Sequence, residues 1–338
     1  MITGLAYSPS FLAHETFPGH PERPERLTSI VSHLQSTGVW DQLAVWEPAP
    51  VPESTLELVH TPRLIESVRE LAQRGGYVDQ DTAVSRTSWE PALRSVGAVV
   101  EAVQRVQHGT CANAFCLCRP PGHHATPSQA MGFCLFNNVA IAAAWLLRNG
   151  TQRLAILDYD VHHGNGTQDA FVADPRVLYL STHQYPLYPG SGHWRERGVG
   201  TTVNISLPPG SGDLVFAEVQ TRLIEPIVRR FQPEFILVSL GFDAFWNDPL
   251  ASLRLSVTGY AALIRAACDL AAELCGRRVV IALEGGYDLQ ALAHGADAVC
   301  RLLLGDDPLP DPLGVARDEL PPASVEPLLR AMAELHDV

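Results

Sequence analysis

The sequence predicts an α/β protein: a single domain with a central, mostly parallel sheet and helices on both faces of that sheet. Two observations lead to this fold class. From about residue 113, short apolar runs alternate with longer segments whose apolar residues recur every three or four positions, the pattern of a parallel sheet with crossover helices. The 338 residues, of which 46% are hydrophobic, are also enough to bury one large core.

Each expected strand is a short apolar run, and each expected helix has one apolar face that can pack on the sheet. The expected strands are Ala112–Leu117, Leu154–Asp158, Val177–Ser181, Thr202–Ile205, Phe235–Leu240 and Val279–Leu283. The expected helices are Asn137–Leu147, Asp213–Phe231, Val257–Cys275 and Gln290–Leu304.

The two ends of the chain have a different character. The first hundred residues contain a strand-like stretch at Ile2–Tyr7 but otherwise look helical, notably at Pro62–Gln73 and Glu90–Val106, and we expect them to cover the sheet edge. We expect residues 1–305 to form the main domain. Residues 306–338 should form a Pro-rich connector and a C-terminal helix, about Ser324–Leu335, packed on the same domain.

Composition excludes several classes of protein. A formal charge of −13 argues against a nucleic-acid partner, which needs clustered basic residues, and favours a cationic substrate. The longest apolar runs are far shorter than the roughly 20 residues that span a membrane. Seven cysteines without regular spacing or a CxxC pair, together with no visible secretory signal, indicate free thiols in a reducing compartment. We therefore expect a cytoplasmic protein without a membrane segment.

Four polar clusters each follow directly after a predicted strand. In open α/β sheets, ligands bind beyond the carboxyl ends of the strands, so the four clusters should meet in one crevice.

The first cluster is the run from Arg119 to His124, in which two prolines and a glycine form a rigid turn before two adjacent histidines. Side chains of adjacent residues diverge, so His123 and His124 are poorly placed to bind one ion together. Acid/base catalysis is the better interpretation, and two structural histidines are the alternative.

The second cluster runs from Asp158 to Asn165. Asp158, Asp160 and His162 alternate along an extended segment and should point to the same side. One carboxylate and one imidazole could hold zinc while the remaining aspartate orients another group. A solvated loop would explain the acids but not their spacing.

The third and fourth clusters follow the last two predicted strands. Asp243 stands after a buried strand, where a carboxylate is costly unless it is paired or binds a cation, and it is the natural third ligand. A helix N-cap is its alternative role. In the run from Glu284 to Tyr287, two glycines allow close approach of the backbone, and the Tyr287 hydroxyl could donate to an oxyanion. The alternative for this tyrosine is simple packing.

Together the motifs RPPGHHA, DYDVHHGNGTQ, GFDA and EGGY occur in an order that resembles the histone deacetylase family of the arginase/deacetylase superfamily. The bacterial relatives of that family are acetylpolyamine amidohydrolases and acetoin-utilisation proteins. The resemblance extends from about His20 to about Gly295. It implies the arginase/deacetylase fold in residues 1–305 as the catalytic domain, and a hydrolase that removes acetyl groups from lysine or similar alkylamines.

The resemblance also implies roles for individual residues. Asp160, His162 and Asp243 would be the ligands of one zinc ion. His124 would be the general base and acid, with His123 as its electrostatic partner and Tyr287 as the oxyanion donor. Asp158 and Asn165 would hydrogen-bond the first and the second histidine of the pair.

Further roles are implied around this centre. The walls of a narrow substrate tunnel would be formed by Gly132, Phe133, Tyr188, Leu250 and Gly286. A structural potassium ion would use Asp158, Ser181 and Thr182, together with Asp160 and His162. Arg26 resembles an arginine at the inner end of the tunnel, where acetate leaves.

Alternative functions remain open from the sequence. An arginase-like site with two manganese ions needs further carboxylates beside Asp243, and the next acid is only Asp248. A catalytically silent module that binds acylated ligands is a second alternative, although both histidines and Tyr287 are present. For the substrate, Leu250 at the rim and the short stretch Gly75–Glu90 favour an acetylated lysine peptide or small acetylated amine over acetylpolyamines.

Overall fold

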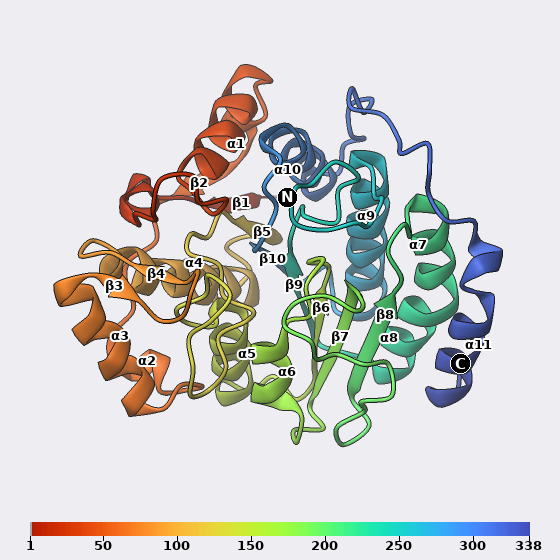
Figure 1. Ribbon diagram of the computed structural model, residues 1–338, viewed down its shortest axis with the longest axis horizontal. Coiled ribbons are helices and arrows are strands. Elements are labelled where there is room, and N and C mark those ends of the chain that lie inside the picture. The colour runs from red at the N-terminus through yellow and green to blue at the C-terminus, as the bar shows by residue number, and fades with distance from the viewer. Residues whose placement is uncertain (1) are drawn as a thin grey trace.

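A computed structural model describes residues 2–338 of the chain (Figure 1). Its centre is an eight-stranded sheet with the order β2-β1-β5-β10-β9-β6-β7-β8, in which every neighbouring pair is parallel. The strands are β1 (Thr3–Ala6), β2 (Ala44–Trp46), β5 (Asn113–Cys116), β6 (Leu154–Asp158), β7 (Val177–Gln184), β8 (Thr202–Leu207), β9 (Phe235–Leu240) and β10 (Val279–Leu283). A small antiparallel pair, β3 (Gly76–Tyr77) and β4 (Ala83–Val84), lies apart from this sheet. The predicted α/β class is confirmed.

Helices cover both faces of the sheet (Figure 1). The α-helices are α1 (Glu25–Ser36), α2 (Glu53–Leu56), α3 (Pro62–Arg74), α4 (Trp89–Gln107), α5 (Asn138–Arg148), α6 (Asn165–Phe171), α7 (Asp213–Val219), α8 (Glu225–Phe231), α9 (Val257–Leu274), α10 (Leu289–Leu304) and α11 (Glu326–Leu335). One layer contains α4, α5 and α6, and the other contains α1, α10, α9 and α8, each packed against the next. Short 3-10 turns occur at η1 (Pro9–Ala13), η2 (Trp40–Gln42) and η4 (Pro322–Ser324).

The strands form where the apolar runs are because this sheet is buried on both faces. Every residue of β6, β9 and β10 is buried, and parallel strands covered by helices have such continuous apolar sequences. Side-chain caps fix where several helices start. The Ser256 hydroxyl, for example, accepts the Gly259 N–H and starts α9 at Val257.

The N-terminal hundred residues differ from the prediction. β1 lies within the strand-like stretch 2–7 and pairs with β5, but the sheet edge beside it is β2. The helices expected in this region form as α3 and α4, and the strand β2 at the sheet edge was not predicted. β2 has three residues, two of them exposed, so no buried apolar run marks it in the sequence.

The predicted helix Asp213–Phe231 is also interrupted. It consists of α7, a π-helical turn η3 (Gln220–Ile224) and α8. Its period of apolar residues continues through the wider turn, which is why sequence alone predicts one helix.

The C-terminal segment runs over the surface of the domain before α11. Its connector is anchored by backbone bonds, including Leu320 N–H to Gly210 O at 2.7 Å. Leu329 and Met332 of α11 are buried against the core, and Arg222 forms an ion pair with Glu326 at 2.6 Å. The last helix therefore packs on the same body as the sheet.

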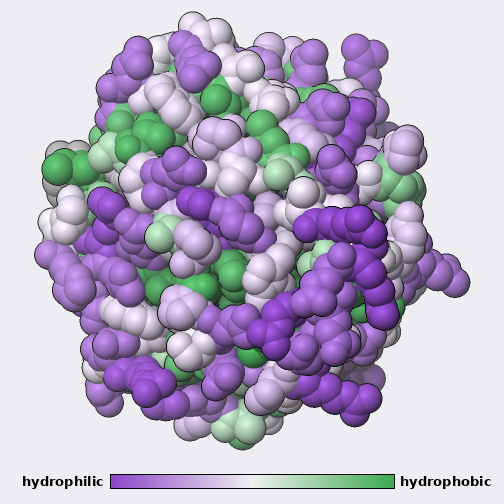
Figure 2. Space-filling view, turned by 90° about the vertical axis from the view of Figure 1, so that its left-hand side faces the viewer, coloured by the Kyte–Doolittle hydropathy of each residue, from purple (hydrophilic) through white to green (hydrophobic). Residues whose placement is uncertain are grey.

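The surface carries mixed polarity. Figure 2 shows one face on which hydrophilic residues predominate and hydrophobic residues form separate small patches. Within residues 2–338, no helix has the length and apolar character needed to cross a membrane.

Candidate active site

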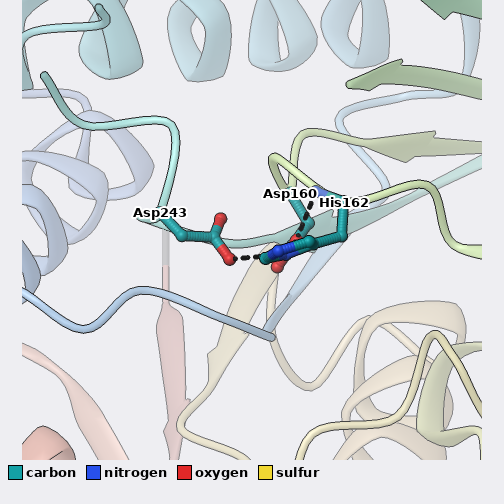
Figure 3. A group of neighbouring side chains, drawn as sticks. All are labelled: Asp160, His162 and Asp243. Carbon is teal, nitrogen blue, oxygen red and sulfur yellow. Dashed lines mark hydrogen bonds and ion pairs between the residues drawn. The ribbon is translucent and has the colours of Figure 1, made fainter. Parts of the chain in front are cut away.

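Three candidate metal ligands meet beyond the carboxyl ends of neighbouring strands. Asp160 and His162 follow β6, and Asp243 follows β9. One ligand atom from each lies within 4.8 Å of the others. His162 Nδ1 is 3.1 Å from Asp160 Oδ1 and 3.2 Å from Asp243 Oδ2, so the imidazole stands between the two carboxylates (Figure 3).

The side chains of Asp160, His162 and Asp243 are chemically suited to binding a cation. Asp243 Oδ2 is buried, and its polar contact within residues 2–338 is the ion pair with His162 Nδ1 at 3.2 Å. Burial would lower the pKa of His162, but Asp160 and Asp243 outweigh it and raise that pKa to about 10. The two carboxylates thus favour positive charge between them, and oxygen and imidazole nitrogen are ligands that Zn²⁺ accepts in proteins.

Backbone amides hold the carboxylates in place. Gly285 N–H donates to Asp160 Oδ2 at 2.9 Å, and Val161 N–H donates to Asp243 Oδ1 at 3.0 Å. A Cβ atom on Gly285 would lie 2.2 Å from Asp243 Oδ2, and one on Gly241 would lie 2.1 Å from Asp160 Oδ2. The close backbone approach expected from the EGGY glycines occurs at Gly285.

The two adjacent histidines have opposite electrostatic environments. Burial disfavours a charged His123, but Asp160 and Asp158 outweigh it and raise its pKa to about 10. Burial, together with the charges of His123 and His162, lowers the pKa of His124 well below its usual value. A protonated His123 therefore lies beside a neutral His124, with ring centres 4.0 Å apart.

Each histidine has the partner that the resemblance implies. His123 Nδ1 lies 3.2 Å from Asp158 Oδ2, and His124 Nδ1 lies 2.8 Å from Asn165 Oδ1. Because the amide oxygen of Asn165 can only accept, the Nδ1 proton belongs to neutral His124 and its Nε2 is free to accept another.

Glu284 is a residue of the site whose role was not predicted. Its carboxylate accepts the N–H groups of Gly122 at 2.7 Å and His123 at 3.1 Å, as well as the Ser239 hydroxyl at 3.1 Å. Burial raises its pKa to about 7. The end of β10 thereby fixes the histidine turn after β5, and the acid just before the two glycines is the only sequence signal for this contact.

Arg26 lies behind the tyrosine of the site. Its Nε donates to Gly286 O at 2.7 Å, a second nitrogen donates to Glu284 O, and its guanidinium carbon is 5.2 Å from the Tyr287 ring centre. Glu22 accepts from Arg26 at 3.2 Å and from Arg119 at 2.7 Å. The side chains of Glu22, Arg26 and Arg119 are fully buried, and the contacts of Glu22 and Arg119 were not predicted.

A cavity of about 320 Å³ leads from the surface to the candidate ligands. The predicted site residues that line it are His123, His124, Gly132, Phe133, Asp160, His162, Tyr188, Leu250 and Tyr287. Asp158, Asn165 and Asp243 lie behind these residues as their hydrogen-bond or ion-pair partners. Gly286 and Arg26 do not line the cavity, and the glycine of the EGGY motif that does is Gly285.

The packing of the cavity wall explains why residue 132 is a glycine. Gly132 has φ of +56°, and a Cβ atom there would lie 2.5 Å from His124 Cδ2 and 3.0 Å from Tyr188 Cε1. Only glycine fits between the histidine and the aromatic wall.

The residues predicted for potassium lie together on two strands. Asp158 of β6 is the register partner of Ser181 of β7, and Thr182 follows it. The Ser181 hydroxyl bonds His183 Nδ1 at 2.8 Å, whereas the buried Thr182 hydroxyl has no partner among residues 2–338.

Comparisons with known proteins agree with this architecture. A family model described as the histone deacetylase domain matches residues 20–303. The chain is 43% identical to a probable deacetylase of Archaeoglobus fulgidus over 86% of this chain and 82% of that protein. It is 38% identical to the chloroplastic histone deacetylase 14 of Arabidopsis thaliana over 90% of this chain and 78% of that protein.

A solved structure shows the same fold. The crystal structure of the HDA15 HD domain superposes with a TM-score of 0.89 and 33% identity, covering 98% of this chain and 94% of that one. The resemblance inferred from the four motifs is confirmed. By sequence and by fold, the chain belongs to the histone deacetylase family of hydrolases.

Proposed function

We propose that this chain is a zinc-dependent deacetylase that hydrolyses the acetamide of acetyl-lysine or a similar acylated alkylamine. One observation carries the proposal: two carboxylates and an imidazole meet at a cavity that a neutral His124 and Tyr287 also line. Such a cavity can receive an extended alkyl chain and place its amide beside all three groups.

Asp160, His162 and Asp243 would hold the zinc ion. When bound, zinc supplies Lewis-acid polarisation of the amide carbonyl and lowers the pKa of water. The buried Asp243 oxygen that faces His162, and the positive charge that Asp160 and Asp243 favour between them, both support a cation there.

His124 would act first as general base. Its Nε2 is the unprotonated nitrogen, because Asn165 fixes the proton on Nδ1, and its ring lines the cavity. The protonated His123 beside it disfavours a second positive charge. His124 would therefore hand its new proton on readily to the departing amine.

Tyr287 would donate its hydroxyl to the developing oxyanion. Burial and the nearby Asp243 raise the pKa of Tyr287 well above its usual value, so the hydroxyl keeps its proton at neutral pH. The edge of its ring packs near Phe133, with centres 6.0 Å apart. Phe133, Tyr188 and Leu250 would form the tunnel walls, with Gly286 shaping the turn behind them.

We also propose a potassium site and an exit route for acetate. A potassium ion at Asp158, Ser181 and Thr182 is supported by their adjacency and by the unpartnered Thr182 hydroxyl. Departure of acetate beside Arg26 stays a prediction, and the contacts of Arg26 also support a role in holding the segment from Glu284 to Tyr287.

We also propose the bounds of the catalytic domain and the cellular compartment. Residues 1–305 would form the catalytic domain and 306–338 its packed connector and helix, because the family match ends at residue 303. A reducing compartment such as the cytoplasm is supported by the seven free cysteines of the chain.

The decisive assay is acetate release from acetyl-lysine peptides, acetylspermidine, acetylputrescine and longer acyl-lysines, with and without a chelator. Chelator-sensitive release supports a metal-dependent deacetylase, and the preferred substrate separates lysine from polyamine specificity. Binding without release would favour a silent acyl-lysine binding module. Two manganese ions per chain would favour the arginase-like alternative.

A further inference from the structure

Asp248 is a buried carboxylate in the loop after β9, and the mechanism above does not use it. The residue is only 7% exposed and makes no ion pair within residues 2–338. Its Oδ2 accepts the N–H of Tyr287 at 2.8 Å, and its Oδ1 accepts the N–H of Leu250 at 2.9 Å. One carboxylate thus joins the loop after β9 to the loop after β10.

A local turn explains only one of these two hydrogen bonds. The bond to Leu250 spans two residues and is an ordinary turn made by an aspartate. The bond to Tyr287 spans 39 residues and contributes nothing to that turn. A buried carboxylate is costly unless hydrogen-bonded, so the second bond offsets much of what its burial costs.

Two side chains hold the peptide between Gly286 and Tyr287: Arg26 Nε donates to Gly286 O at 2.7 Å, and Asp248 Oδ2 accepts the Tyr287 N–H at 2.8 Å. Gly286 before it has φ of +108°, a conformation that glycine adopts with great freedom. The Tyr287 hydroxyl makes no hydrogen bond within the described part of the chain, and beyond its main chain Tyr287 is held by ring contacts with Arg26 and Phe133. The position of the backbone therefore sets how far the hydroxyl reaches into the cavity.

We propose that Asp248 is a positioning residue, which fixes the main chain of Tyr287 so that its hydroxyl meets the substrate carbonyl oxygen. The inference rests on the proposed function, in which Tyr287 donates to the oxyanion. The same carboxylate also bonds the N–H of Leu250. It therefore fixes the distance between Leu250, at the rim of the cavity, and Tyr287, at its inner end.

A double-mutant cycle separates this role from general stability. We expect Asp248→Ala to lower kcat by about 10-fold to 100-fold, the cost of misplacing a catalytic group by about 1 Å. In a Tyr287→Phe background, we expect Asp248→Ala to lower kcat by less than about threefold, because the hydroxyl that Asp248 positions is already absent. Asp248→Asn keeps the volume and one acceptor, and should give an intermediate kcat if the alanine variant folds poorly.

Asp311→Ala is the matched control. The Asp311 carboxylate also accepts backbone N–H groups, from Leu313 at 2.8 Å, Val257 at 3.1 Å and Gly314 at 3.3 Å, but it lies in the C-terminal connector. Its loss should leave kcat within about twofold of the unsubstituted protein, since it is remote from the cavity. An unchanged kcat in Asp248→Ala, or an equal loss with and without the Tyr287 hydroxyl, would overturn the inference.

Amide hydrogen exchange tests the same contact without activity. The Tyr287 amide should exchange faster in Asp248→Asn and Asp248→Ala, and at its normal rate in Asp311→Ala. Normal protection of this amide in both Asp248 variants would also overturn the inference. If the unsubstituted protein releases no acetate at all, the proposed function fails, and the exchange data still decide whether Asp248 holds Tyr287.

Discussion

Replacing Gly285 by alanine should disrupt the proposed metal site while leaving the fold in place. The added Cβ would lie 2.2 Å from Asp243 Oδ2 and 2.7 Å from Asp160 Oδ2, whereas ordinary contacts begin at 3.4 Å. Gly285 does not have a positive φ, so the backbone itself accepts alanine. The strain therefore falls on the two candidate ligand carboxylates.

The size of the effect follows from these distances. To restore ordinary contact, the Asp243 oxygen must retreat by about 1.2 Å, and metal–ligand distances tolerate changes of only about 0.2 Å. Loss of a group that merely orients a ligand costs up to about 100-fold in metal affinity. We expect at least that loss here, about 2.7 kcal/mol or more of binding free energy.

The assay is zinc affinity by chelator competition, with metal content by mass spectrometry and thermal unfolding measured in parallel. Gly259→Ala is the matched control, because its Cβ would lie 2.2 Å from the carboxylate of Asp213, between α7 and α9. Both variants should lose stability, and only Gly285→Ala should lose zinc affinity. Equal zinc affinity in Gly285→Ala and the unsubstituted protein would refute this account of the glycine.

Three further predictions concern catalysis, metal and pH. His124→Ala and Tyr287→Phe should fold, keep zinc and lose about 100-fold to 1000-fold in kcat in the acetate-release assay. Near-normal turnover in either variant would contradict the proposed mechanism. Asp243→Asn should lower zinc content after dialysis, and unchanged content would remove Asp243 from the ligand set. Burial lowers the pKa of His60 and of His163 from 6.5 to about 4, so the unfolded chain takes up protons first and stability is lost as pH falls from 6.5 towards 4. Urea unfolding at pH 5 should show a loss of about 2 kcal/mol for each histidine relative to pH 7.5, and equal stability at both pH values would contradict this assignment.

The sequence predicts the sheet well where strands are buried. β6, β9 and β10 stand out because parallel strands between two helix layers are continuous apolar runs. β2 does not stand out, because an edge strand of three partly exposed residues carries little hydrophobic signal. The π turn inside the predicted helix 213–231 is invisible for a related reason: it widens one turn without changing which face is apolar.

The candidate site was likewise predictable from the sequence only in part. The convergence of four clusters is predictable because the carboxyl ends of parallel strands share one edge of the sheet. The contacts of Glu284 and Asp248 are not, because each carboxylate bonds backbone N–H groups far along the chain, 162 residues away for Gly122 and 39 for Tyr287. Any residue except proline offers such an N–H, so no pattern of residue types marks it.

The order of β6, β9 and β10 in the sheet has a consequence for how the chain matures. Asp160, Asp243 and the Gly285 amide come from three adjacent strands that are distant in sequence. Contacts of such high sequence separation form late, after loop closure has been overcome. During synthesis, the ribosome must therefore release residue 285 before these three groups can meet, and metal uptake at the proposed site would report that the central sheet has closed.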